Sequence, residues 1–60
     1  MNQVMQYYQK RYNLEIIEED GEIKDIYHIV NGNKIKMVKE ENRWVCKDGN
    51  YVLCIPNICN

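Results

Sequence analysis

The chain has 60 residues, of which 45% are hydrophobic and 28% charged, and its formal net charge is −1. A chain of this length buries only ~60% of the surface that its unfolded form exposes, so we expect one small domain of marginal stability over residues 1–60. The composition is that of a folded protein rather than a disordered segment. The charge balance excludes a whole-protein field that would draw the chain to nucleic acid or to an anionic membrane.

The chain shows no sign of export. No apolar stretch reaches the ~20 residues of a membrane helix, and the N-terminus lacks a basic and then apolar export signal. We therefore expect a cytoplasmic protein of a bacterium or a phage-infected host, with Cys46, Cys54 and Cys59 as reduced thiols. Asn, Ile, Lys and Tyr abound while Ala, Ser, Thr and Phe are absent. Codons of the abundant set are rich in A and T, which indicates a low-GC genome.

The first 13 residues predict an amphipathic helix over about residues 3–12. The apolar residues Val4, Met5, Tyr8 and Tyr12 recur at helical spacing, with polar residues on the other side. Asn2 can cap the start of this helix, and Asn13 can adopt the left-handed conformation at its end.

Turn signals divide the remaining chain into short β-branched runs. Asp20-Gly21, Asn31-Gly32 and Asp48-Gly49 are strong hairpin signals, and Glu41-Asn42 is a fourth candidate turn. They predict strands over about residues 14–18, 22–30, 33–40, 43–47 and 50–55, followed by a tail over 56–60. Residues 23–30 also carry apolar residues at helical spacing, but their β-branched content favours a strand. We expect an α+β fold, with the N-terminal helix packed on one face of a five-stranded antiparallel β-meander.

Two-residue turns fix which residues pair across each hairpin. The Asn31-Gly32 turn predicts that His28 pairs with Ile35 and Ile26 with Met37. The last two turns predict that Val45 pairs with both Val38 and Val52. For the first hairpin we expect a three-residue turn with Gly21 in the left-handed conformation, because it sets Leu14 opposite Ile26 among the other large apolar residues.

This register separates two faces of the sheet. The inner face, which the helix covers, carries Leu14, Ile16, Ile26, His28, Val30, Ile35, Met37, Trp44, Cys46, Tyr51, Leu53 and Ile55. The outer face carries Tyr27, Ile29, Val38, Val45 and Val52, with a basic rim of Lys34, Lys36, Arg43 and Lys47. An apolar row with a polar rim is typical of an interaction surface, although valine is also a good strand former.

Charge is distributed unevenly along the chain. The first hairpin is acidic, with Glu15, Glu18, Glu19, Asp20, Glu22 and Asp25. The next stretch is basic, with Lys34, Lys36, Lys39, Arg43 and Lys47. The simplest interpretation is two solvated hairpins that attract each other.

Catalytic and metal sites are not indicated. His28, Cys46, Cys54 and Cys59 lack the Cys-x-x-Cys spacing of a zinc site, and no acyl-enzyme motif surrounds any cysteine. The adjacent carboxylates Glu18 and Glu19 are typical of solvated hairpin charge. We expect no cofactor, no metal and no enzymatic activity.

The sequence therefore favours a non-enzymatic protein-binding module, a small regulator or inhibitor from a phage or mobile element of a low-GC bacterium. Its partner would be another protein or a second copy of the chain. One alternative is a small single-stranded nucleic-acid-binding protein that uses the basic sheet face with Tyr27 and Trp44. Another is a self-associating accessory subunit.

Overall fold

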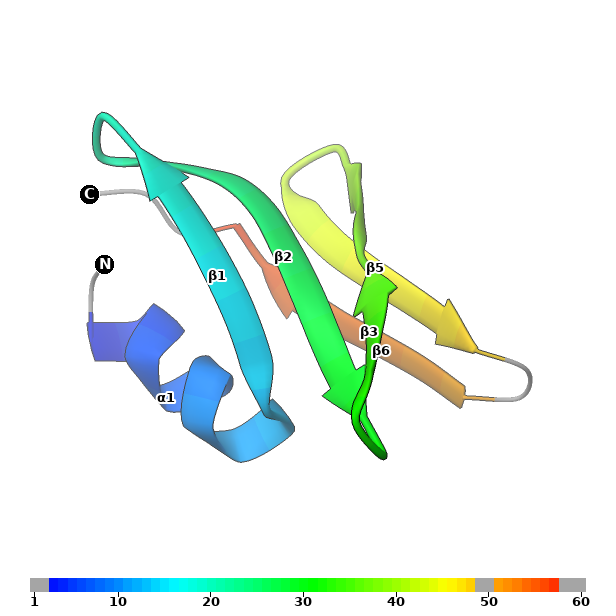
Figure 1. Ribbon diagram of the computed structural model, residues 1–60. Coiled ribbons are helices and arrows are strands. Elements are labelled where there is room, and N and C mark those ends of the chain that lie inside the picture. The colour runs from blue at the N-terminus through cyan, green and yellow to red at the C-terminus, as the bar shows by residue number, and fades with distance from the viewer. Residues whose placement is uncertain (1–2, 49–50, 58–60) are drawn as a thin grey trace.

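Six strands follow one N-terminal helix in the computed structural model, which describes residues 3–48 and 51–57 (Figure 1). The elements are α1 (Gln3–Tyr12), β1 (Leu14–Glu19), β2 (Glu22–Val30), β3 (Asn33–Lys36), β4 (Val38–Glu40), β5 (Arg43–Asp48) and β6 (Tyr51–Pro56). They form two three-stranded antiparallel sheets, ordered β1-β2-β3 and β4-β5-β6. The α+β class is confirmed, whereas the single five-stranded meander is wrong.

The helix ends as its sequence predicts. Asn13 follows the last helical residue with φ of 57°, the left-handed conformation that terminates many helices. Its main-chain oxygen then accepts a hydrogen bond from Ile29 N at 3.0 Å, so β1 begins to pair with β2 directly after the helix. The predicted cap Asn2 lies outside the described residues. Met5 is the buried residue of the helix, and the partly buried Tyr8 and Tyr12 pack against the core.

The first hairpin has a tighter turn than expected, and a β-bulge compensates for it. Glu19 pairs with Glu22 across Asp20 and Gly21, whose φ angles of 55° and 79° are both left-handed. Continued without interruption, this register would turn Leu14 and Ile16 away from the core. The register shifts between Ile17, which pairs with Asp25, and Glu18, which pairs with Ile23, so Lys24 is an extra residue in β2.

The bulge restores the predicted inner face, although the predicted pairing is wrong. Leu14 pairs with His28 instead of Ile26, and Ile16 pairs with Ile26. The second hairpin follows its prediction, because Val30 pairs with Asn33 and His28 with Ile35 across the Asn31-Gly32 turn.

The predicted long strand over residues 33–40 is divided at Met37, between β3 and β4. Met37 N donates a hydrogen bond to Ile26 O at 2.9 Å, which extends the pairing of β3 with β2 by one step. Beyond Met37 the chain leaves β2 and pairs with β5, as Val38 with Val45 and Glu40 with Arg43. One run of chain thus serves as the edge strand of both sheets, which is the physical reason that the meander splits.

The last hairpin is displaced from its predicted register. Asp48 pairs with Tyr51, so Cys46 lies opposite Leu53 and Val45 opposite Cys54 instead of Val52. Each partner moves by two residues, from Val52 to Cys54, and side chains alternate with a period of two along a strand. The assignment of residues to faces is therefore unchanged.

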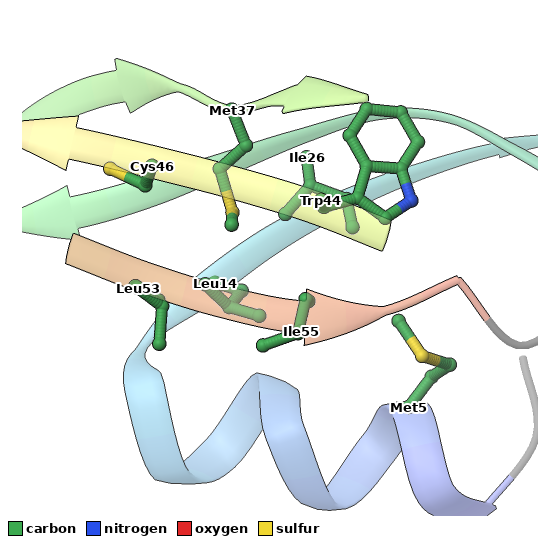
Figure 2. Close-up of a cluster of buried hydrophobic side chains, with 8 residues drawn as sticks. All are labelled: Met5, Leu14, Ile26, Met37, Trp44, Cys46, Leu53 and Ile55. Carbon is green, nitrogen blue, oxygen red and sulfur yellow. The ribbon is translucent and has the colours of Figure 1, made fainter. Parts of the chain in front are cut away.

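The core lies on the inner face of both sheets, with α1 against it. It contains Met5, Leu14, Ile26, Met37, Trp44, Cys46, Leu53 and Ile55, all drawn in Figure 2. Met5 points from α1 toward Ile55 of β6 (Figure 2). Ile16, Ile23 and Ile35 are partly buried against this cluster, and His28 is buried. Val30 is half-buried, and the side chain of Tyr51 lies outside the described part of the structure.

Candidate binding surface

All nine residues of the predicted binding face lie on the outer side of the two sheets. Tyr27 pairs with Lys36 and Ile29 with Lys34 in the first sheet. Arg43, Val45 and Lys47 alternate along β5, and Val38 and Val52 lie on the strands beside it. We call this set the outer face: Tyr27, Ile29, Lys34, Lys36, Val38, Arg43, Val45, Lys47 and Val52.

The three valines of the outer face differ in burial. Val38 and Val52 are each 60% exposed, whereas Val45 is only 6% exposed. The expectation that Val45 is the exposed centre of a valine row is therefore wrong. Val45 lies on the central strand of its sheet, directly between Val38 and Cys54, and neighbours on both sides shield it from water.

Val45 is the floor of a small hollow on the outer face. The hollow has a volume of about 230 Å³ and is lined by Lys36, Val38, Glu40, Val45 and Lys47. Val45 supplies an apolar floor, and the exposed Val38 adds a second apolar side chain. Two lysines and one carboxylate complete the lining. A concave apolar spot with a charged rim suits one protruding apolar side chain of another protein.

Ion pairs neutralise much of the basic rim. Lys34 Nζ lies 2.7 Å from a carboxylate oxygen of Glu15, and Lys36 Nζ lies 3.8 Å from one of Asp25. Lys34 also lies over the Tyr27 ring, 5.7 Å from its centroid. The acidic first hairpin and the basic stretch after it therefore meet side by side on the first sheet.

The hydrogen bond from Lys34 to Glu15 raises the pKa of the lysine above its usual 10.5, and the charge of Glu15 adds to this. A raised lysine pKa means that the pair favours the folded state below pH 10.5. This contribution is lost as the pH rises through the folded-state pKa.

On the second sheet the basic residues are paired less completely. Arg43 lies 3.9 Å from Glu40 at the β4–β5 turn. Lys47 and Lys39 have no carboxylate within 4 Å among the described side chains. Among the described side chains of the two sheets, the lysines without an ion pair therefore lie on β4 and β5.

A larger hollow lies where the two sheets separate, and we call it the fork. It has a volume of about 640 Å³ and is lined by residues 22–25 of β2, residues 36–39 and Trp44. Its boundaries follow from the pairing described above. β2 pairs with the β3 run as far as Ile26, and beyond that point β4 turns to β5. No sequence pattern indicates the fork, because the fork depends on the bulge at Lys24 and on the break at Met37.

The residues considered for catalysis or metal binding are separated. Cys46 is buried in the core, whereas Cys54 is exposed on the opposite face. Cys59 lies outside the described residues. Within residues 3–48 and 51–57, no three His, Cys, Asp or Glu side chains gather as metal ligands would. Glu18 and Glu19 are exposed near the end of β1.

Comparison of the chain with models of protein families, with curated proteins and with solved structures found no match. Over the described part of the chain, no helix has the length and apolarity that crossing a membrane requires.

Proposed function

We propose that this chain is a non-enzymatic protein-binding module that docks on another protein through the outer face. The observation that carries the proposal is the pair of exposed valines, Val38 and Val52, on the two strands that flank the buried Val45. Exposed β-branched side chains around an apolar hollow lose contact with water when a partner covers them, which is favourable. Lys47 at the rim has no ion pair with the described side chains, and its ammonium group would favour a partner that carries acidic residues around an apolar contact.

The biological role that we propose is that of a small regulator or inhibitor from a phage or mobile element of a low-GC bacterium. The support for this origin is compositional, because the abundant amino acids have codons rich in A and T. Such a role requires a surface and no catalytic groups. The proposed cellular location is the cytoplasm of the bacterium or of the phage-infected host.

The proposal is tested by placing a charge on the outer face where the fold tolerates it. Val38→Lys and Val52→Lys change exposed residues, so the melting curve should move little, because lysine lowers strand propensity only modestly. Desolvating the new ammonium group should weaken partner binding about tenfold or more. Capture of proteins from a low-GC bacterial lysate measures binding to other proteins, and light scattering measures self-association.

Val4→Lys is the matched control, because Val4 is an exposed valine of α1 and not of the outer face. It should leave captured proteins and self-association unchanged. If all three variants behave like the parent chain, the exposed valines are strand formers without a binding role. A salt-dependent affinity for single-stranded DNA that all the valine variants retain would instead select the nucleic-acid alternative.

A further inference from the structure

The fork exposes main-chain groups of β4 that pair with no strand in the described part of the chain. Met37 N donates to Ile26 O, and main-chain groups alternate in direction along an antiparallel strand. The N–H and C=O of Lys39 therefore point to the same side as those of Met37, away from β5. Among the described residues, no strand pairs with β4 on that side. An open strand edge of this kind can pair with an extended segment of another chain.

The charges around this edge favour an acidic segment. Lys24, Lys36 and Lys39 line the fork, against two carboxylates. Glu22 lies 3.5 Å from Lys24 and Asp25 lies 3.8 Å from Lys36, which leaves Lys39 without an ion pair among the described side chains. Lysines at an open edge also disfavour pairing with the same edge of a second copy.

The fork also has an apolar floor. Ile23 is half-buried at one side, and Met37 and Trp44 reach the fork from the core. Side chains on one face of an extended segment could contact this floor beside Lys39, which lies opposite Trp44, while the alternate side chains would face Lys36. The fork is an open hollow of about 640 Å³, so a segment that lies along it would keep one side exposed.

We propose that the fork binds an extended acidic segment of a partner protein as an added strand on the β4 edge. The main-chain groups of Lys39 would pair with the segment. Its carboxylates would lie against Lys24 and Lys36, and the ammonium group of Lys39 would add positive charge at the same edge. This inference rests on the proposed protein-binding function, because it names the chemistry of one part of the partner. Lys36 and Val38 line both the fork and the hollow at Val45, so the two surfaces adjoin.

The test uses a defined probe, so it does not depend on knowing the partner. The probe is an acetylated and amidated peptide of alternating valine and glutamate, about seven residues long, which spans roughly 23 Å when extended. It is titrated into the full chain, and binding is followed by NMR at the amides of Lys24 and Lys39 and at the Trp44 indole. We expect these signals to shift together.

Two altered peptides separate charge from strand pairing. A peptide with lysine in place of glutamate should bind at least tenfold more weakly. A peptide that is N-methylated at its interior amides keeps every charge but loses its main-chain donors, and it should also bind at least tenfold more weakly. If either altered peptide binds with the same affinity as the parent peptide, the proposal is overturned.

Lys39→Glu should weaken binding of the acidic peptide about two- to tenfold, as expected for reversal of one exposed charge. Lys39→Gln should have an intermediate effect. Lys10→Glu is the matched control, because Lys10 is an exposed lysine of α1 that has no ion pair among the described residues and does not line the fork. Its effect should stay below about twofold. The amide spectrum of each variant shows whether it is folded.

Other outcomes would overturn the fork proposal and leave the outer-face proposal intact. Shifts confined to Val45, Lys47 and Val52 would place the peptide on the outer face. Absence of binding by any probe would show that the fork takes no acidic strand. Shifts at Lys39 that depend on protein concentration without peptide would identify a second copy as the occupant. Conversely, the outer-face proposal could fail while the fork proposal holds. In that case the peptide would bind in the fork and Val52→Lys would not change its affinity.

Discussion

Trp44 links the core to the end of the last strand. Its side chain is 3% exposed, and its Nε1 donates a hydrogen bond to Asn57 Oδ1 at 3.1 Å. It lies opposite Ile55 on one neighbouring strand and opposite Lys39 on the other. The same indole is therefore part of the core (Figure 2), and it also lines the fork.

Trp44→Ala should lower the free energy of unfolding by about 3–5 kcal/mol, the usual cost of truncating a buried aromatic residue. A stability of ~0.05–0.15 kcal/mol per residue gives so short a chain little reserve, so this loss should unfold most of the protein. Urea unfolding followed by circular dichroism measures the effect. Trp44→Phe keeps an aromatic ring and should cost less. A Trp44→Ala variant that melts like the parent chain would show that the indole lies outside the core.

Alternation along the strands predicted which way most side chains point, but not how deeply they are buried. Alternation with outward-facing residues predicts that Trp44 and Cys46 lie in the core, and both are buried. Val45 faces the other side, as alternation predicts, yet it is buried as well. Its burial depends on Val38 and Cys54 in the neighbouring strands, and a period of two within one strand carries no information on such neighbours.

At the scale of the element, the first hairpin joins a short turn to a bulge. The Asp20-Gly21 pair predicts a two-residue turn, whereas the positions of Leu14 and Ile16 require the opposite side-chain alternation. Lys24 resolves this conflict, because one extra residue in β2 reverses the alternation beyond it. The bulge was not predictable from local sequence, since a three-residue turn satisfies the same hydrophobic pattern.

The last hairpin shows a second limit of the same kind. Val45 can pair with Val52 or with Cys54, and each apolar residue of this hairpin faces the same side in both registers. The hydrophobic pattern therefore cannot choose between them. The second hairpin has no such ambiguity. Its Asn31-Gly32 turn places both residues in the left-handed conformation, with φ angles of 51° and 82°, and the predicted pairing is confirmed.

Deletion of Lys24 should leave the fold intact. The pairs on both sides of the bulge, Ile17 with Asp25 and Glu18 with Ile23, would then follow one another as in a regular ladder. A straighter β2 would bring Ile23 toward Lys39 and narrow the fork, so the acidic peptide should bind more weakly. Near-ultraviolet circular dichroism of Trp44 and the peptide titration measure these effects. Loss of the fold on this deletion would mean that the bend of the bulge is required to bring the two sheets together.

At the scale of the whole molecule, two small sheets share one core through a single crossing at Met37. The central strands are β2 and β5, and each has a paired strand on both sides for at least part of its length (Figure 1). The chain crosses between the sheets on the β3–β4 run. Because the two sheets share one core, neither sheet can form its full set of contacts without the other. The division into two sheets was not evident in the sequence, because residues 33–40 alternate regularly as one strand would.

Amide hydrogen exchange should reveal this arrangement. The amide of Met37, which donates to Ile26 O, and that of Val45 in a central strand should exchange slowly, because opening them disrupts the shared core. The amide of Lys39, only two residues from Met37, should exchange much faster because no described strand pairs with its side of β4. NMR-detected exchange in D₂O measures all three. Equal protection of Lys39 and Met37 would mean that the β4 edge is covered.

The β3–β4 run has a consequence for how the chain can change in length. Ile35 and Met37 are directed to the inner face and Lys36 and Val38 to the outer face, without interruption from one sheet to the next. One residue inserted or deleted within this run would exchange the inner and outer sides of one sheet relative to the other. The position of Lys24 is free of this constraint, because it already holds a supernumerary residue. We therefore expect evolution to add and remove residues at the hairpin tips and at the bulge, and to conserve the length of the run through Met37.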